Sequence, residues 1–170
     1  MSGFPPPGFR LELLDRSHRR RQFSSGDRRV DEWLQRKALP AIEKHTSTTR
    51  VLLHDDVIAG YYTLANTALD VSLIPPELLG GKPATRPAPT VTVAWLGVDE
   101  RFRGHGLGTQ LFARSLSDCV RAWQLVRFVT VMVDALTEQN HAFYRAHGFT
   151  PVPETTHKLY LPSSTLLDII

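Results

Sequence analysis

The chain has 170 residues, of which 42% are hydrophobic and 22% are charged, and it contains one cysteine. A chain of this length buries about two-thirds of the surface that it exposes when unfolded, so we expect a single domain over residues 1–170. No apolar run approaches the roughly 18 residues of a membrane span, and the first residues lack the charged and apolar parts of a signal peptide. These absences predict a soluble, cytoplasmic protein without a membrane partner. The lone Cys119 excludes an internal disulfide and is expected to be a core thiol.

Turn residues and hydrophobic periodicity predict the elements of the first 90 residues. Val30, Trp33, Leu34 and Ala38 form the apolar stripe of one helix, which Pro40 is expected to kink or split. In chain order we expect a flexible segment (1–8), a strand (9–14), this helix (27–45), a hairpin (50–54 and 57–65) turning at Asp55 and Asp56, a further short strand (67–73), and a proline-rich irregular loop (75–90) that forms a flap on the substrate side.

The second half alternates strands and helices more regularly. We expect a strand (91–98), a helix (106–123), a strand (127–135), a helix (137–147) and a final short strand (158–161). The complete order predicts an α/β (α+β) fold in which helices cover both faces of a mixed sheet.

Positive charge is concentrated at the start of the chain. Residues 1–50 contain eleven of the twenty Lys and Arg residues and six of the seventeen Asp and Glu residues, a balance of +5, whereas residues 51–170 have a balance of −2. A basic surface suits an anionic partner such as RNA, and a solvated face that keeps the protein soluble explains the pattern equally well. The residues predicted to contact an RNA substrate are Arg19, Arg20, Arg28, Arg29 and Arg36.

A glycine turn joins the strand over 91–98 to the next helix. Its glycines are Gly104, Gly106 and Gly108. Glycines let main-chain N–H groups approach a ligand, and a helix start leaves unpaired donors and a partial positive charge, which together suit a pyrophosphate. The spacing matches neither the dinucleotide fingerprint nor the P-loop. A glycine-rich turn without a ligand is the alternative.

Two motifs in this order resemble the GNAT superfamily of N-acetyltransferases. Arg103, Gly106 and Gly108 match the Arg/Gln-x-x-Gly-x-Gly/Ala pattern of its acyl-CoA pyrophosphate loop, and residues 140–149 are similar to the Ala-x-x-Phe-Tyr-x-x-x-Gly-Phe signature that closes the domain. The likeness extends from Ser24 to Pro153. It implies the GNAT fold, a mostly antiparallel mixed sheet whose central strands splay apart, with acetyl-CoA (coenzyme A) as cofactor. No metal site is predicted.

The resemblance also assigns the cofactor site. Main-chain groups of the strand are expected to hydrogen-bond the pantetheine, and N–H groups of the turn are expected to bind the pyrophosphate. Two arginines can add charge-assisted contacts to the phosphates, although loop arginines are commonly only solvated. The predicted cofactor-binding residues are Leu96, Gly97, Val98, Arg101, Arg103, Gly104, His105, Gly106, Leu107, Gly108 and Thr109.

Tyr144 is the predicted catalytic residue. It matches the family tyrosine that protonates or hydrogen-bonds the coenzyme A sulfur. A phenol with a pKa of about 10 is a suitable donor to a thiolate with a pKa of about 8.5. A half-buried core tyrosine is the structural alternative. Phe143 and Phe149 are expected to pack the helix against the sheet.

The strand over 91–98 has no carboxylate, which bears on the acceptor. Family members that acetylate lysine often carry a glutamate there, because an amine with a pKa of about 10.4 must first lose a proton. An α-amine has a pKa of about 7.7 to 8.0, and esterification of its carboxyl lowers this further, so it needs little base. We therefore expect an activated α-amine. Candidates for a base acting through water, each better explained by a capping or surface role, are Asp99, Glu100, Asp134, His105 and His141.

The amino-terminal half resembles the toxin branch of the superfamily. The likeness is carried by residues 23–26, 30–34, 49–51 and 58–64. That branch acetylates the amino group of aminoacyl-tRNA, is usually neutralised by a small DNA-binding antitoxin, and often forms dimers. Where it often has an arginine before the glycine turn, this chain has Trp95, which puts toxicity in question, although an indole can stack on a base or on adenosine.

Three functions therefore remain open at this point. The first is an acetyl-CoA-dependent N-acetyltransferase that acts on the α-amine of aminoacyl-tRNA, as the toxin of a toxin–antitoxin pair and as a homodimer. The second is an N-acetyltransferase that acts on a small-molecule amine or a protein amino group without a toxin role. The third is a non-catalytic acyl-CoA-binding module, against which the intact Tyr144 argues.

Overall fold

The computed structural model describes residues 3–73, 75–79 and 87–169. The chain divides into two compact units, one formed by Met1–Ala65 and Trp95–Ser115 and the other by Asn66–Ala94 and Leu116–Ile170. The expectation that the chain acts as one domain stays a prediction. None of the helices in the described ranges is both long and apolar enough to cross a bilayer.

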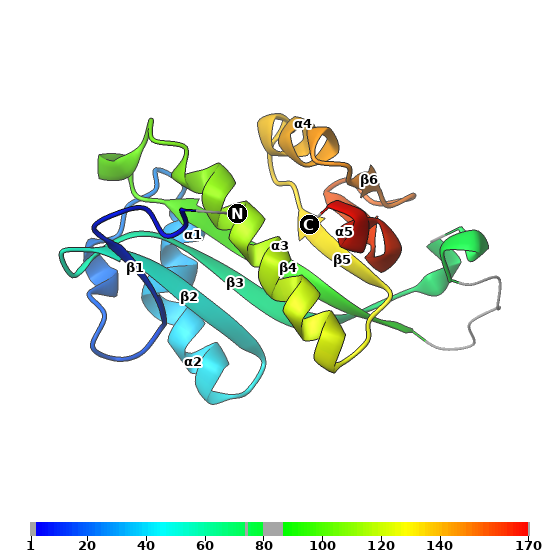
Figure 1. Cartoon of the computed structure of the whole chain (residues 1–170), viewed down its shortest axis with the longest axis horizontal. Helices are drawn as coiled ribbons and strands as arrows, with labels where there is room; N and C mark the ends of the chain where they lie inside the picture. The colour runs from blue at the N-terminus through cyan, green and yellow to red at the C-terminus, as the bar shows by residue number, and fades with distance from the viewer. Residues whose placement is uncertain (1–2, 74, 80–86, 170) are drawn as a thin grey trace. The chain divides into compact units, whose positions relative to one another are not determined.

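Seven strands form one mixed sheet in the order β1-β2-β3-β4-β5-β7-β6 (Figure 1). β4 and β5 pair in parallel, whereas β1 with β2, β2 with β3, β5 with β7 and β6 with β7 pair antiparallel. The predicted mixed, mostly antiparallel sheet is confirmed. The strands are β1 (Phe9–Leu13), β2 (Ser47–His54), β3 (Val57–Leu69), β4 (Ala88–Val98), β5 (Thr130–Asp134), β6 (Thr150–Pro151) and β7 (Lys158–Pro162).

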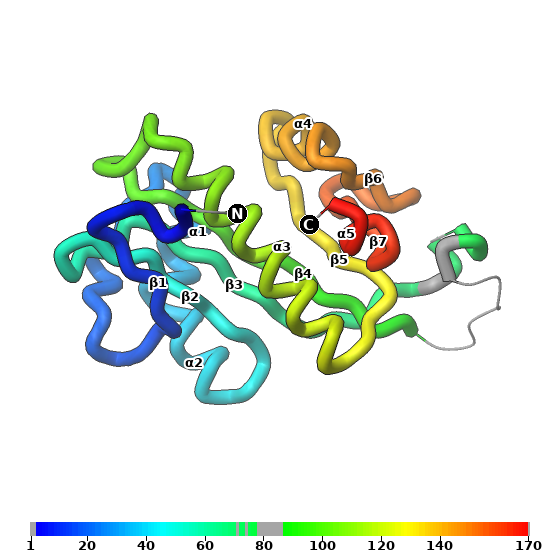
Figure 2. Tube along the Cα trace, in the orientation of Figure 1, coloured from blue at the N-terminus to red at the C-terminus, as the bar shows by residue number. Residues whose placement is uncertain are grey.

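Helices cover both faces of the sheet in the first unit. Alternate residues of a strand point to opposite faces, and Val51 packs with Leu34 of the amino-terminal helical segment, whereas its neighbour Leu52 packs with Leu111. Figure 2 shows the two helical layers on either side of β2 and β3. The α-helices are α1 (Arg28–Glu32), α2 (Ala38–Glu43), α3 (Leu107–Leu125), α4 (Glu138–Ala146) and α5 (Ser163–Ile169).

The predicted hairpin is confirmed and is longer than expected. Asp55 and Asp56 have φ angles of 48° and 64°, the left-handed pair that a type I′ turn requires between twisted strands. Farther along, the pairing register shifts between Leu52 and Leu53, which leaves Ala59 as an extra residue on β3. The carbonyl of Ala59 accepts a hydrogen bond from the N–H of Asp99 at 2.8 Å. The irregularity thus anchors the end of β4.

The predicted helix over 27–45 is interrupted before the proline rather than at it. α1 begins after Asp27, whose side chain accepts from the N–H of Arg29, and a π-helical turn over Trp33–Lys37 leads into α2. In a regular helix the ring of Pro40 would clash with the carbonyl four residues earlier, which belongs to this wide turn. The turn accommodates the proline inside α2.

The second unit has its own core under β5 and β7. Leu69, Met132, Val152 and Tyr160 form a buried cluster. α4 begins after Thr137, whose hydroxyl accepts from the N–H of Asn140 at 3.1 Å, which confirms the predicted start of this helix.

Several predicted boundaries were wrong. The strand expected over 67–73 is absent as a separate element, since β3 continues to Leu69 and a 3-10 turn follows at Val71–Leu73. The loop expected over 75–90 contains a second 3-10 turn at Pro76–Leu79, and β4 already begins at Ala88. Residues 74 and 80–86 lie outside the described part.

Other differences concern the ends of the chain. β5 begins at Thr130 rather than at 127. Short β6 and the terminal α5, neither predicted, lack a long periodic pattern and depend on their partners. The flexibility of residues 1–8 stays a prediction, although Phe4 packs against a core cluster.

Candidate functional site

The glycine turn connects β4 to α3 in the first unit, as predicted. Gly104 and Gly106 have φ angles of 84° and 71°, a region that residues with a Cβ rarely adopt, and a Cβ at either position would meet no atom within 4 Å. Backbone geometry therefore explains these two glycines, and the space in front of them is open. Gly108 has an ordinary φ, and a Cβ there would lie 3.7 Å from Val98. This matches the Gly/Ala choice at the last position of the motif.

The turn presents unpaired main-chain donors. The first regular hydrogen bond of α3 runs from the N–H of Gln110 to the carbonyl of Gly106 at 3.1 Å. The N–H groups of Leu107, Gly108 and Thr109 therefore have no partner inside the helix. A 19-residue helix also places a partial positive charge at this end, so the turn is suited to an anionic group such as a pyrophosphate.

Asp99 fixes the start of the turn. It is 1% exposed, and its carboxylate accepts from the N–H of Arg101 at 2.9 Å and from the Arg101 guanidinium at 2.8 and 3.0 Å. It also accepts from the N–H of Ser24 at 3.0 Å. Burial would raise the pKa of Asp99, but these hydrogen bonds outweigh it and hold the pKa below its usual value. Asp99 therefore caps the 3-10 turn Glu100–Phe102 in its ionised form, the role that the sequence favoured over that of a base.

Further contacts join the same two segments. The N–H of Glu100 donates to the carbonyl of Ser24 at 2.8 Å, and the Arg103 guanidinium donates to the carbonyl of Ser25. A Cβ on Gly26, whose φ is 90°, would lie 2.7 Å from Arg103 and 2.8 Å from Glu100. We use the name 24–103 clasp for the hydrogen bonds that join Ser24 and Ser25 to Asp99, Glu100 and Arg103. The guanidinium groups of Arg101 and Arg103 thus bind protein oxygens, and their contact with phosphates stays a prediction.

Side chains pack tightly against the main chain of β4 just before the turn. Gly97 is packed so closely that a Cβ would lie 2.5 Å from Val30 and 3.3 Å from Tyr61. The parallel pairing of β4 with β5 ends at Val93, and β4 continues to Val98. This agrees with central strands that separate. The predicted contacts of Leu96, Gly97 and Val98 with pantetheine stay predictions.

Tyr144 lies on α4 in the second unit. Its side chain is half-buried and contacts the rings of Phe143 and Phe149, at ring-centroid distances of 5.4 and 6.0 Å. The packing of these two phenylalanines between the helix and the sheet stays a prediction. Burial, together with the negative charge of Asp134, raises the pKa of Tyr144 to about 12. The phenol is therefore protonated at neutral pH and can act as a proton donor.

The other candidate bases have structural or surface roles. Asp134 lies 3.7 Å from the ammonium of Lys158, and Glu100 lies 3.9 Å from Arg103. His105 is exposed in the glycine turn, and His141 lies on α4. No described residue of β4 carries a carboxylate, because the strand contains none in its sequence.

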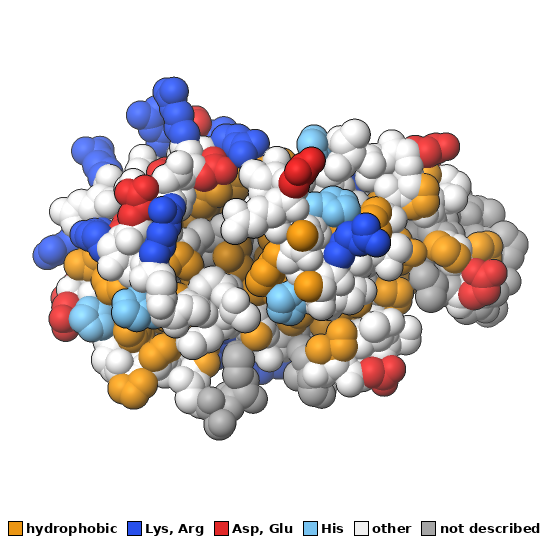
Figure 3. Space-filling view, turned by 90° about the horizontal axis from the view of Figure 1, so that it is seen from above, with side chains coloured by type: hydrophobic (Ala, Val, Ile, Leu, Met, Phe, Trp, Pro, Cys, Tyr) orange, Lys and Arg blue, Asp and Glu red, His pale blue; other side chains and the backbone are white. Residues whose placement is uncertain are grey.

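The predicted RNA-contacting residues lie in different environments. Arg19, Arg28 and Arg36 are exposed, whereas Arg29 pairs with Asp27 at 3.0 Å. Arg20 is partly buried, and its Nε has no hydrogen-bond partner among the described residues. Lys and Arg side chains gather on one side of the face shown in Figure 3, interspersed with acidic ones. Acidic residues also lie beside arginines within the amino-terminal half, as in the pairs Arg16–Glu43 and Arg29–Asp27, so this half carries charges of both signs.

Trp95 stacks on Trp33, with ring centroids 5.4 Å apart and an interplanar angle of 13°. Trp33 in turn donates its indole N–H to the hydroxyl of Thr63 at 2.9 Å. One face of Trp95 is therefore covered by protein. Stacking of Trp95 on a base, which the sequence left open, would have to use its other face.

The geometry can now be compared with known proteins. The model of the acetyltransferase (GNAT) family matches residues 11–149. The chain belongs to the acetyltransferase (GNAT) family. The glycine turn and Tyr144 both lie within the matched range, so the two motifs that carried the resemblance are part of this GNAT domain.

Two curated proteins are similar to this chain over most of their length. A tRNA-acetylating toxin of Mycobacterium tuberculosis is 30% identical over 131 residues, which cover 77% of this chain and 78% of that protein. A probable toxin TacT of Sinorhizobium fredii is 24% identical over 170 residues, 94% of each chain.

Solved structures share the fold. AtaT complexed with acetyl-methionyl-tRNAfMet has a TM-score of 0.84 at 23% identity and covers 95% of this chain and 98% of its own. AtaTR bound with AcCoA has a TM-score of 0.83 at 24% identity with the same coverage. These likenesses confirm the predicted GNAT fold.

The 24–103 clasp and the Trp33–Trp95 stack were missed by sequence reasoning. Both join residues more than sixty positions apart, so no local pattern signals them. The only sequence signal was Gly26, which follows two serines and precedes a helix-capping Asp27.

Proposed function

We propose that this chain transfers an acetyl group from acetyl-CoA to the α-amine of an aminoacyl-tRNA, as the toxin of a toxin–antitoxin pair. The observation that carries the acceptor is the 30% identity with a tRNA-acetylating toxin over 131 residues. The lack of a carboxylate on β4 supports it, because an α-amine next to an ester is largely neutral at physiological pH.

The glycine turn fits the donor. Acetyl-CoA supplies an activated thioester and a pyrophosphate by which it can be held. The N–H groups of Leu107, Gly108 and Thr109 are unpaired inside α3, and the space in front of Gly104 and Gly106 is open. Main-chain groups of Leu96, Gly97 and Val98 would hold the pantetheine. In this proposal His105 is part of the turn. Arg103 holds the turn through its hydrogen bond to the carbonyl of Ser25, and Arg101 positions the turn through its ion pair with Asp99.

Tyr144 supplies the proton for the leaving group. Attack of the neutral amine forms the C–N bond and breaks the C–S bond, the Tyr144 hydroxyl gives its proton to the sulfur, and the new amide nitrogen loses one to solvent. The raised pKa of Tyr144 keeps the phenol protonated over the physiological range. No side chain on β4 is required as a base.

The acceptor side is assigned to the amino-terminal half. We propose that tRNA contacts the basic surface that contains Arg19, Arg20, Arg28 and Arg36, with Arg29 engaged by Asp27. Trp95 would stand beside the aminoacyl end, stacked on Trp33.

The assembly and location are part of the same proposal. We propose a cytoplasmic homodimer that is neutralised by a small DNA-binding antitoxin. Complexes of this kind exist among proteins of the same fold, such as AtaT bound to the C-terminus of the antitoxin AtaR and the KacTA–DNA complex.

The experiment offers labelled acetyl-CoA to the purified protein with charged tRNA, deacylated tRNA or free amines. We expect label on charged tRNA alone, with loss of translation when the protein is expressed and recovery with Tyr144→Phe. Transfer to free amines or protein amino termini without transfer to charged tRNA would instead establish the small-amine function. Absence of transfer to every acceptor, with acetyl-CoA binding retained, would establish a non-catalytic module.

A further inference from the structure

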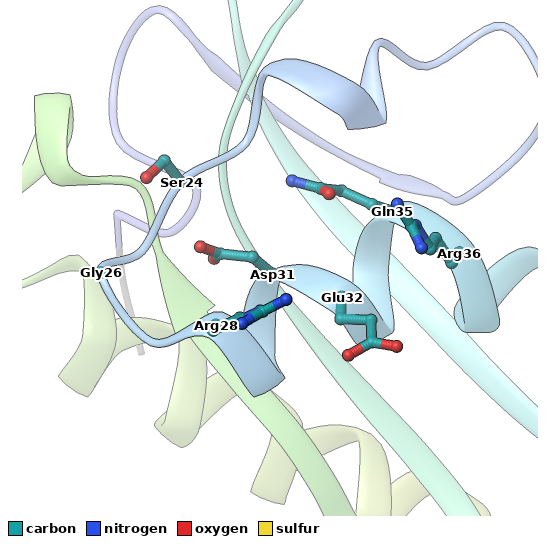
Figure 4. A pocket seen from close by; sticks show the side chains of 7 residues that line it. All are labelled: Ser24, Gly26, Arg28, Asp31, Glu32, Gln35 and Arg36. Carbon is teal, nitrogen blue, oxygen red and sulfur yellow. The ribbon is translucent and has the colours of Figure 1, made fainter.

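A polar cavity of about 440 Å³ lies in the first unit, between the loop at Ser24 and Gly26 and the helical segment that follows (Figure 4). Arg28, Asp31 and Gln35 line its helical wall at intervals of three and four residues, so they share one face of the helix. Its volume lies in the range of pockets that hold small ligands. The cavity is large enough to be a site.

Hydrogen bonds on both sides fix the loop wall of this cavity. The carboxylate of Asp31 accepts from the N–H of Ser25 at 2.7 Å, and the amide of Gln35 donates to the carbonyl of Phe23 at 2.8 Å. Figure 4 shows Asp31 and Gln35 reaching from the helix toward the loop. From the other side, the 24–103 clasp holds Ser24 against Asp99. The cavity is therefore preformed and is joined to the segment that precedes the glycine turn.

Two cations of the cavity have no protein partner. Arg28 and Arg36 are exposed, and among the described residues no hydrogen bond or ion pair engages either guanidinium. By contrast, Arg10 pairs with Glu12 and Asp56, and Arg16 pairs with Glu43. An unpaired guanidinium can bind a phosphate through two parallel hydrogen bonds.

The cavity also contains acceptors and an amide. Asp31 uses one carboxylate oxygen for Ser25, and Glu32 lies 3.8 Å from the exposed Lys37. Bare phosphate would be repelled by these carboxylates, so a simple anion is a poor match. A ribonucleotide matches better, because it combines an anionic phosphate with hydroxyl and amino groups that donate hydrogen bonds.

We propose that this cavity binds one ribonucleotide near the 3′ end of the RNA acceptor, with its phosphate on Arg28 and Arg36 and its ribose hydroxyls or base on Asp31, Glu32 and Gln35. The inference rests on the proposed function and adds to it, since it selects two of the basic residues and one nucleotide. The clasp then places this nucleotide at a fixed position relative to the donor turn.

The test compares two doubly substituted proteins that lose the same charge. One is Arg28→Ala with Arg36→Ala, and the control is Arg10→Ala with Arg16→Ala, which removes two arginines that do not line the cavity. The probe is a fluorescent RNA minihelix with a single-stranded 3′ end. We expect the cavity variant to bind it about 10-fold or more weakly and to lower the salt slope by about 0.7, the value for one lost phosphate contact on a single strand.

A second arm tests the ribose and base contacts. Gln35→Leu keeps the charge, and we expect it to reduce the preference for a ribonucleotide over a deoxyribonucleotide at the 3′ end. Thermal unfolding of each variant shows whether it is folded. Equal RNA binding by the cavity variant and its control would overturn the proposal, as would an undiminished ribose preference in Gln35→Leu. If wild-type protein binds the minihelix through the cavity but does not acetylate charged tRNA, the proposed function fails and the nucleotide site stands.

Discussion

Replacing Asp99 tests how much the cap before the glycine turn contributes to the stability of the protein and to its binding of acetyl-CoA. The buried carboxylate accepts four hydrogen bonds, two from main-chain N–H groups of Ser24 and Arg101 and two from the Arg101 guanidinium. Each main-chain hydrogen bond to this charged group contributes about 1.5–3 kcal/mol. The Arg101 side chain is 51% exposed, so its two hydrogen bonds compete with water and together contribute about 0–1 kcal/mol. We therefore expect Asp99→Ala to lower the free energy of unfolding by about 3–7 kcal/mol, the sum of two main-chain bonds and the guanidinium pair.

Asp99→Asn should lower the free energy of unfolding by less than Asp99→Ala, because asparagine keeps one acceptor oxygen. Some stability is still lost, because its amide N–H₂ group faces hydrogen-bond donors. For a chain of this size, 1 kcal/mol corresponds to roughly 2–4 °C in Tm, so Asp99→Ala should unfold about 6–28 °C lower. Denaturant unfolding at neutral pH measures the free energy. Asp70→Asn is the matched control, since Asp70 also precedes a 3-10 turn and, among the described residues, its carboxylate accepts from the N–H and hydroxyl of Ser72 alone.

Acid should remove the same contribution from the wild-type protein. The pKa of Asp99 is lower in the folded state than in the unfolded state, so its contribution is present above the ordinary aspartate pKa, about 3.9, and is lost as the pH falls through the folded value. Asp99→Asn should therefore lose less stability than wild type on acidification. The KM for acetyl-CoA should rise in this variant. Equal stability, equal acid sensitivity and an unchanged KM would refute the structural role assigned to Asp99.

Three further predictions follow from the two units. Tyr144→Phe should lower kcat about 100-fold with little change in acetyl-CoA affinity. Because the pKa of Tyr144 is raised to about 12, ionisation of this residue should cause no fall of the wild-type kcat between pH 7 and about 9; a fall in this range that Tyr144→Phe does not share would contradict the raised value. Gly106→Ala should weaken coenzyme A binding, because its φ of 71° strains a side chain, whereas Gly108→Ala should leave binding near wild type, as titration calorimetry would show. Cys119 should resist iodoacetamide at pH 8 in the folded protein, since burial raises its pKa to about 12, and rapid labelling detected by mass would disprove this.

Local chemistry explains what could be predicted. The hairpin turn at Asp55 and Asp56, the helix that starts at Thr137 and the glycine turn each depend on residues within a few positions of one another, so their sequence patterns were sufficient. The mixed sheet followed from the order of its elements. Boundaries failed where pairing decides them, as at Leu69 and Ala88, because an edge residue extends a strand only when its partner is present.

In the candidate site, too, features that depend on neighbouring residues could be predicted, whereas features that depend on distant residues could not. The motif around Gly104 and Gly106 revealed the donor turn, and its φ values bear out the reason for the glycines. The cavity next to it could not be predicted, because its wall depends on Asp99 and Arg103 meeting a loop more than seventy residues away. The interruption of the first helix was expected at Pro40 itself, but the chain widens earlier, at Trp33–Lys37, the turn that contains the carbonyl four residues before the proline.

The clasp also bears on how this protein can diverge. It holds the loop almost wholly through main-chain atoms, namely the N–H and carbonyl of Ser24 and the carbonyl of Ser25. The side chain at position 24 can therefore be exchanged without detaching the loop from the donor turn, while Gly26 cannot. If the proposed acceptor and donor sites are right, substitutions in the loop can change the acceptor while the glycine turn and its donor are kept.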